Sequence, residues 1–208
     1  MSDTTLWERD ALTGSPVEVA PRLLGAVISH NGVAVRITEV EAYGGSDDPG
    51  SHAFRGPTPR SQIMFGEAGR AYVYFSYGMH HCLNIVCGPT GSAGAILLRG
   101  GEVIQGEASA RRRRDKARSV PHPYRDLARG PARLASAVDV DLNSNGVDVC
   151  DPDCSLGLLA GHPVDPASVS TGPRVGVRGP GGDASTYPWR FWVSADPTVS
   201  TYRPAVRR

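Results

Sequence analysis

Alternating apolar and polar residues predict a β-strand that begins at Val33 and places its aliphatic side chains on one face. If the alternation continues, the same face receives Glu39, Glu41 and Tyr43. A carboxylate on a buried face is costly unless it is hydrogen-bonded or has a function, because burial disfavours its charged form. Two explanations stay open: one glutamate pairs with an arginine while a bulge turns the other to water, or the carboxylates have a chemical role.

A second alternating segment, residues 71–77 (AYVYFSY), predicts a strand that ends at Gly78. Tyr72 and Tyr74 share one face of this strand, and smaller or apolar residues together with Tyr77 share the other. Further strands are predicted over three segments: residues 95–98 with Arg99 at the exit, residues 174–177 and residues 189–193.

Helices are predicted where capping signals precede apolar residues. Ser15, Pro16 and Glu18 form a capping box, which predicts a short helix from residue 16 to about residue 24. Helices are also predicted over residues 102–116 and 131–137. Because strands and helices interleave irregularly, we expect an α+β fold with a curved, largely antiparallel β-sheet flanked by short helices. We expect residues 1–208 to form a single domain with short flexible ends, about 1–14 and 203–208.

Composition indicates a loop-rich chain that does not cross a membrane. The 208 residues include 25 glycines and 17 prolines, and one loop that these residues punctuate, residues 44–61, contains His52. The polar N-terminus and the absence of a long apolar run predict a soluble, cytoplasmic protein. Four cysteines form loose pairs, Cys82 with Cys87 and Cys150 with Cys154. We favour free thiols over a zinc site or disulfides for these pairs.

The formal net charge is only +1, so affinity for nucleic acid has to come from local clusters of arginine. One cluster, Arg111–Arg114, is followed closely by Lys116 and Arg118. It fits either a DNA contact or a solvated run of charges, and the sequence does not separate the two.

Flat side chains are unusually dense between residues 43 and 84, just downstream of Glu41. The segment holds Tyr43, His52, Tyr72, Tyr74, Tyr77, His80, His81 and Asn84. A single tyrosine or histidine is more often structural than functional. Several flat rings beside an acid, however, form a slot suited to a flipped base.

Ordered sequence blocks resemble the alkyladenine DNA glycosylases, also called 3-methyladenine DNA glycosylases, of base excision repair. The blocks are EVEAYGGSDDPGSHAFRGPTPRSQIMF, YVYFSYGMHHCLNI, AILLRGGE, RGPARLASAV and RVGVRG followed by PWRFWV. The resemblance implies an enzyme that flips alkylated purines out of duplex DNA and hydrolyses the N-glycosidic bond, leaving an abasic site. It also implies that the protein acts as a monomer on double-stranded DNA and needs no metal or cofactor.

The resemblance assigns the reaction to Glu41 as the general base and to Arg99 as the residue that helps to hold the attacking water. A carboxylate can accept a proton from water and stabilise an oxocarbenium-like sugar. A lysine nucleophile would add strand cleavage, but the sole lysine, Lys116, lies outside the resembling blocks. We therefore expect a monofunctional glycosylase.

The same resemblance assigns base recognition to Tyr43 and His52 on one wall of a pocket and to Tyr74 on the opposite face. Asn84 matches a residue that disfavours guanine, and Tyr77 matches the wedge that enters the duplex. Stacking on an aromatic ring contributes roughly 1 to 3 kcal/mol per base. Alkylation at N3 or N7 makes a purine cationic, which favours contact with tyrosine faces.

Two other function classes remain open from the sequence. The first is a non-catalytic nucleic-acid-binding module that uses the same aromatic slot. The second is a metal-dependent hydrolase of nucleotides or phosphoesters that uses His52, His80, His81 and the Asp-rich turns, although their spacing is not typical of a metal site.

Overall fold

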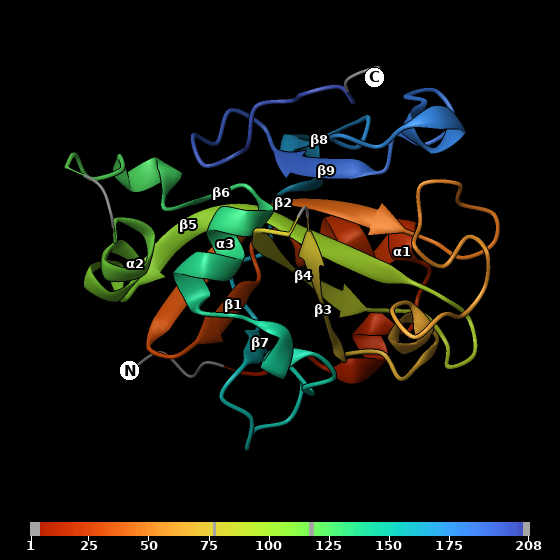
Figure 1. Ribbon diagram of the computed structural model, residues 1–208, viewed down its shortest axis with the longest axis horizontal. Helices are drawn as coiled ribbons and strands as arrows, with labels where there is room; N and C mark the ends of the chain where they lie inside the picture. The colour runs from red at the N-terminus through yellow and green to blue at the C-terminus, as the bar shows by residue number, and fades with distance from the viewer. Residues whose placement is uncertain (1–4, 77, 117–118, 206–208) are drawn as a thin grey trace.

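The computed structural model describes residues 5–76, 78–116 and 119–205, and its centre is one large β-sheet (Figure 1). The strands follow the order β3-β4-β5-β2-β1-β7, with β6 paired to β5, and β9 joined to β2 and β8. They are β1 (Val27–His30), β2 (Val33–Tyr43), β3 (Ala71–Ser76), β4 (His80–Val86), β5 (Ala95–Gln105), β6 (Ala128–Arg129), β7 (Gly157–Leu159), β8 (Val169–Gly172) and β9 (Arg190–Val193). All pairings between these strands are antiparallel, which confirms the predicted α+β class.

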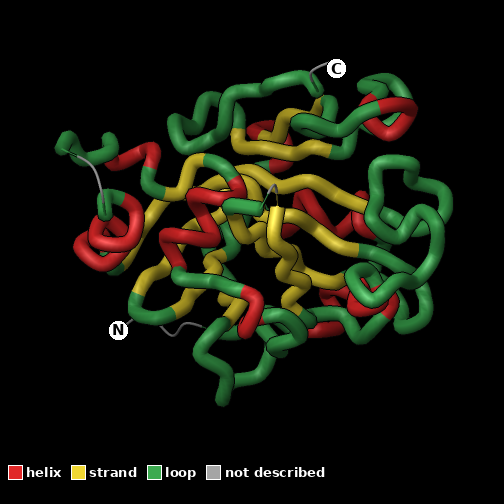
Figure 2. Tube along the Cα trace, in the orientation of Figure 1, coloured by secondary structure: helices red, strands yellow, loops and turns green. Residues whose placement is uncertain are grey.

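Helices in the described part of the chain are short, as predicted (Figure 2). The α-helices are α1 (Pro16–Val19), α2 (Glu107–Arg114) and α3 (Pro131–Val138). The 3-10 helices are η1 (Arg9–Leu12), η2 (Ala20–Leu23), η3 (Gln62–Phe65), η4 (Tyr124–Asp126), η5 (Leu142–Ser144), η6 (Pro166–Ser168) and η7 (Gly179–Gly182). The predicted capping box is present at the start of α1, which passes directly into η2. None of the described helices has the length and apolar character needed to cross a bilayer.

Strand β2 is irregular at the place that matters most for the site. Its pairing with β5 shifts between Ile37 and Glu39, which leaves Thr38 as the extra residue of a bulge. Before the bulge the core face carries Val33, Val35 and Ile37, whereas after it Val40 and Ala42 join the same core. The bulge therefore removes Glu39 and Glu41 from the apolar face on which an unbroken alternation would place them.

The predicted faces of strand β3 are confirmed. Ala71 and Val73 belong to the main core, while Tyr72 and Tyr74 pack in a second, smaller cluster on the other face. Tyr77, the predicted wedge, lies outside the described residues.

Two predicted elements are wrong in extent or type. Residues 102–105 continue strand β5, and the helix expected from residue 102 begins only at Glu107, because Gly106 has a left-handed conformation, with φ of +77°. Residues 174–177 form no strand, and the nearby strand is instead β8 (Val169–Gly172). The alternation at residues 174–177 misled because the buried side chain there is a charged one, Arg174, which is 1% exposed.

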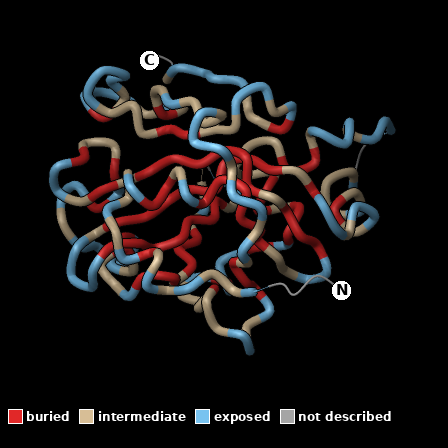
Figure 3. The backbone as a smooth tube through the Cα atoms, turned by 180° about the vertical axis from the view of Figure 1, so that it is seen from behind, coloured by how far each residue is buried: buried red, intermediate tan, exposed pale blue. Residues whose placement is uncertain are grey.

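The core lies against the sheet, and buried backbone runs through the middle of the molecule with exposed loops around it (Figure 3). Helix α3 lies across the sheet in Figure 1 and contributes Leu134, Ala135, Ala137 and Val138 to the core. In the N-terminal segment, Leu12 is fully buried and belongs to this core.

Candidate active site

A cavity of about 500 Å³ opens beside strands β2 to β5 and is closed by the loops at residues 49–60 and 175–178. It brings together six of the seven predicted site residues: Glu41, Tyr43, His52, Tyr74, Asn84 and Arg99. These residues come from four strands and one loop, so no single segment could have indicated their proximity.

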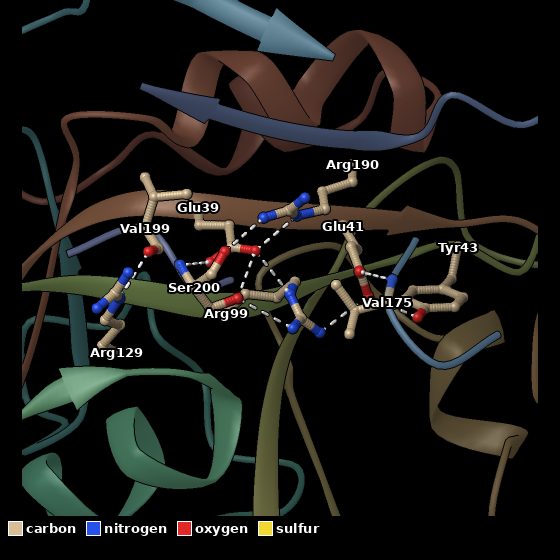
Figure 4. Close-up of polar contacts among 9 residues, drawn as sticks. All are labelled: Glu39, Glu41, Tyr43, Arg99, Arg129, Val175, Arg190, Val199 and Ser200. Carbon is tan, nitrogen blue, oxygen red and sulfur yellow. Dashed lines mark hydrogen bonds and ion pairs between the residues drawn. The ribbon is translucent and has the colours of Figure 1, made fainter. Parts of the chain in front are cut away.

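Glu41 is held by three donors (Figure 4). The backbone N–H of Val175 donates to Oε1 at 2.6 Å, and the Tyr43 hydroxyl donates to Oε2 at 2.8 Å. Arg99 Nη1 also lies 3.4 Å from Oε2. A carboxylate offers about four acceptor positions, so one remains for a further donor such as water.

Glu41 lines the cavity, yet its relative exposure is 0%. The Tyr43 hydroxyl and the Val175 backbone cover its two oxygens. Water therefore reaches the carboxylate only after one of these neighbours moves. The arrangement is that of a restrained acid at the wall of a pocket, because the charge is paired and no oxygen faces bulk solvent.

Arg99 joins the two glutamates that follow the aliphatic part of β2. Its Nε donates to Glu39 Oε1 at 3.0 Å, and Arg190 Nε donates to the same oxygen at 2.7 Å. Burial disfavours the charged form of Glu39, but Arg99, Arg190 and the hydrogen bonds from Ser200 outweigh it and lower the pKa of Glu39. Burial likewise opposes the charge of Arg99, but Glu41 and Glu39 raise its pKa. Glu39 thus pairs with two arginines, whereas Glu41 pairs with Arg99 alone, and Glu39 fixes Arg99 beside Glu41.

Tyr43 is braced from behind by a buried ion pair. Arg174 lies over the Tyr43 ring, with Cζ 4.6 Å from the ring centroid, and binds Asp48 through two hydrogen bonds of 2.6 and 2.7 Å. Both side chains of the pair are 0% exposed. Burial, the charge of Glu41 and the ring of Tyr74 raise the pKa of Tyr43 well above its usual value, so its hydroxyl stays protonated and donates to Glu41.

His52, Tyr72 and Tyr74 form a contiguous aromatic group in the lining of the cavity. The His52 ring meets Tyr74 edge-on, with centroids 4.8 Å apart, and His52 Nδ1 lies 2.8 Å from the Tyr72 hydroxyl oxygen. Burial and the nearby charge of Arg60 lower the pKa of His52 to about 4, so the imidazole is neutral at pH 7. His52 therefore contacts Tyr74 directly, whereas the sequence prediction placed the two on opposite walls.

Asn84 is 3% exposed and its amide donates to the Tyr72 carbonyl at 3.0 Å, across the β3–β4 pairing. This bond orients the side chain at the inner wall of the cavity. Sequence reasoning missed four residues of the site: Arg60, Tyr72 as a partner of His52, Arg174 and Val175. All four stand in the quoted blocks, Arg174 and Val175 in RVGVRG, but no local pattern shows that Arg174 is buried.

Most arginines of the run on α2 already donate hydrogen bonds to other parts of the protein. Arg111, Arg113 and Arg114 donate to backbone carbonyls of other segments, and Arg113 alone reaches Ala137 and Asn31 at 2.7 Å each. All four cysteines are free. Within residues 5–76, 78–116 and 119–205, no three histidine, cysteine or acidic side chains gather as metal ligands would.

Comparison with known proteins shows the family. The sequence pattern of methylpurine-DNA glycosylases matches residues 10–197. A protein of Leifsonia xyli subsp. xyli is 53% identical over 97% of this chain and 96% of its own, and one of Streptomyces avermitilis is 51% identical over 97% and 93%. Both bear the name "Putative 3-methyladenine DNA glycosylase", as does a protein of Nocardia farcinica that is 45% identical over 95% of this chain and 92% of its own.

The match extends from η1 past the end of β9 and so includes every element that surrounds the cavity. It agrees with the resemblance seen in the sequence blocks. The chain belongs to the methylpurine-DNA glycosylase family and is a DNA glycosylase, an enzyme of DNA repair that hydrolyses N-glycosidic bonds.

Proposed function

We propose that this glycosylase flips alkylated purines, such as 3-methyladenine and 7-methylguanine, out of duplex DNA and hydrolyses their N-glycosidic bonds with a water activated by Glu41. The observation that supports this proposal most is the environment of Glu41: a buried carboxylate, held by three donors, at the wall of a cavity lined by tyrosine rings. A purine in this cavity would place its sugar carbon near the carboxylate.

In the proposed reaction Glu41 accepts a proton from water while the glycosidic bond breaks. Its negative charge also stabilises the oxocarbenium-like sugar, and the departing purine keeps the bonding electron pair. Arg99 holds the carboxylate in place and contributes a donor for the attacking water. The Tyr43 hydroxyl, which covers Oε2 in the free protein, moves to admit that water.

Base recognition in this proposal depends on the aromatic group. Tyr43 and Tyr74 supply the stacking faces, and neutral His52 and Asn84 supply polar contacts at the edges of the base. Because His52 touches Tyr74 in the free protein, an entering purine displaces the His52 ring or lies between Tyr43 and Tyr74. Tyr77 is proposed as the wedge that fills the vacated stack, since it follows directly after Ser76 at the end of β3.

We propose that the enzyme is monofunctional and acts as a monomer, with the whole chain forming one glycosylase domain. The sole lysine, Lys116, lines a separate hollow beside α2 and is not among the residues that line the cavity. A Schiff base with the sugar is therefore not available at Glu41, and hydrolysis leaves an intact abasic strand.

The proposal is tested by incubating the protein with methylated duplex DNA and measuring released purines and strand breaks together. We expect free methylpurine, an intact abasic strand until alkali is added, and the same rate with a chelator. Binding without base release would favour the non-catalytic module, and loss of release in the chelator would favour the metal-dependent hydrolase.

A further inference from the structure

An arginine covers the ring on which a flipped base is proposed to stack. Arg60 Cζ lies 4.7 Å from the centroid of Tyr74, and Arg60 lines the same cavity as Glu41. A planar guanidinium on an aromatic face occupies the position that a stacked purine needs. We propose that Arg60 is a specificity-determining residue that disfavours cationic damaged purines relative to neutral ones.

The main chain that presents Arg60 is held in place by its own hydrogen bonds. The Thr58 N–H donates to Ser61 Oγ at 3.0 Å, the Ser61 N–H donates to Thr58 Oγ1 at 3.1 Å, and the Gln62 N–H donates to the Thr58 carbonyl at 2.8 Å. Ser61 is fully buried, whereas Arg60 is exposed. The fixed turn therefore keeps the Arg60 side chain at the mouth of the cavity, and only the side chain has to move when a base enters.

The charge of Arg60 is not balanced by a neighbouring acid. Among the described cavity-lining residues Glu41 is the single carboxylate, against three cations: Arg60, Arg99 and Arg178. Arg99 is paired with Glu41 and Glu39, but no ion pair joins Arg60 to a carboxylate of the described chain. His52 adds no further positive charge, because it is neutral at pH 7.

The consequence differs between two classes of damaged base. A neutral purine such as hypoxanthine displaces the guanidinium and gains the Tyr74 face. A cationic purine such as 7-methylguanine gains the same face but also meets the tethered charge of Arg60 a few ångströms away. Between the dielectric constant of bulk water and that of a protein surface, two like charges about 6 Å apart shift a binding ratio by roughly three- to a hundredfold, and we take tenfold as the middle of this range. Arg60 thus acts against the preference for cations that bare tyrosine rings would give.

This inference rests on the proposed function. The test compares the release of two lesions as a ratio, so that the inference can fail while the proposed function holds. Single-turnover efficiency is measured on two duplexes that differ only in the lesion, 7-methylguanine or hypoxanthine. Any contact of Arg60 with DNA phosphate affects both duplexes equally and cancels. Arg60→Gln removes the positive charge, and Arg60→Lys keeps the charge but removes the planar group that stacks on Tyr74. Arg178→Gln is the control: it removes an exposed cation at the rim of the cavity, and within the described chain Arg178 has no aromatic contact.

We expect Arg60→Gln to raise the ratio of 7-methylguanine release to hypoxanthine release about tenfold. Arg60→Lys should leave this ratio within about threefold of the wild type, and Arg178→Gln should change the ratio less than Arg60→Gln does. An unchanged ratio in Arg60→Gln overturns the inference while leaving the proposed function intact. Equal changes in Arg60→Gln and Arg178→Gln also overturn it, because they assign the effect to rim charge in general. If the wild-type protein releases neither base, the proposed function and the inference fall together.

Discussion

Arg174 shows how much a single side chain contributes behind the visible site. Besides Asp48, it donates to the carbonyls of Ala42 and Gly181, and its plane lies over Tyr43. It thereby joins the end of β2 to two loops that border the cavity. The adjacent residue, Val175, presents its N–H to Glu41, so the fixed position of Arg174 also fixes one donor to the acid.

Asp48→Asn tests this arrangement. The substitution leaves the guanidinium of Arg174 buried without its counter-charge, and breaking a buried pair in this way typically costs about 3 to 5 kcal/mol. We expect a loss of that order in the free energy of unfolding by denaturant. The double variant Asp48→Asn, Arg174→Met should recover part of the loss, since no unpaired charge remains. An Asp48→Asn protein as stable as the wild type would contradict the structural role assigned here.

The pKa of His52 gives a second test at the scale of one residue. Its folded value of about 4 lies below the ordinary value of 6.5, so the unfolded chain binds more protons between these limits. The neutral ring therefore contributes stability that is fully present above pH 6.5 and is lost as the pH falls toward 4. We expect the His52 resonances to titrate near pH 4 by NMR, and His52→Gln to lose less stability on acidification over this range. Titration near 6.5 would show that burial and Arg60 do not act on the ring as described.

At the scale of elements, the pairing of β2 with β5 positions Glu41, and Gly101 permits the two strands to approach closely. A Cβ on Gly101 would lie 2.4 Å from the Arg36 carbonyl oxygen and from Val35 Cγ1. Gly101→Ala should therefore destabilise the protein by roughly 1 to 3 kcal/mol, as overpacking of a filled core does. Thermal unfolding measures the effect, and Gly32→Ala, where nothing lies within 4 Å of the added atom, controls for the loss of a glycine. The control position has a φ of +76°, so a small strain is expected there too.

The elements also show what the sequence could and could not predict. The start of β2, the faces of β3 and the capping box of α1 depend on local alternation and local hydrogen bonds, and all three were predicted correctly. One of the two explanations left open was a bulge that turns one glutamate to water. The structure has a bulge, at Thr38, but both glutamates are buried, and the pairing with β5 that causes the bulge is not visible in the local sequence. The end of β5 and the loop at residues 174–177 were wrong for the same reason: tertiary contacts overrode the local pattern.

The candidate site, like the secondary structure, was predicted only in part from the sequence. The resemblance supplied six residues that the structure brings to one cavity, which periodicity alone could not have done. The resemblance assigned the reaction to Glu41, but the alternation along the strand could not separate Glu39 from Glu41. The structure does, because Glu39 accepts from Arg99, Arg190 and Ser200, whereas Glu41 faces the cavity with one acceptor position unfilled.

At the scale of the whole molecule, the low net charge requires that DNA binding depend on particular cations. Affinity should fall steeply with salt, because phosphate contacts release counterions. Arg113 should not belong to that set, since its guanidinium is already bound to two backbone carbonyls. We expect Arg113→Ala to lower the melting temperature but to leave the slope of log affinity against log salt unchanged. A slope that falls by about one unit would place Arg113 on phosphate instead.

The central claim, that Glu41 activates water in this cavity, is tested most directly by single-turnover release of 7-methylguanine from duplex DNA by Glu41→Gln. Glutamine keeps the shape of the side chain but cannot accept a proton, and general-base catalysis typically contributes about 10² to 10⁴ in rate. The account predicts a loss of that size, with lesion binding retained and with Glu107→Gln on α2 as active as the wild type. Release by a folded Glu41→Gln protein within about threefold of the wild-type rate would contradict it.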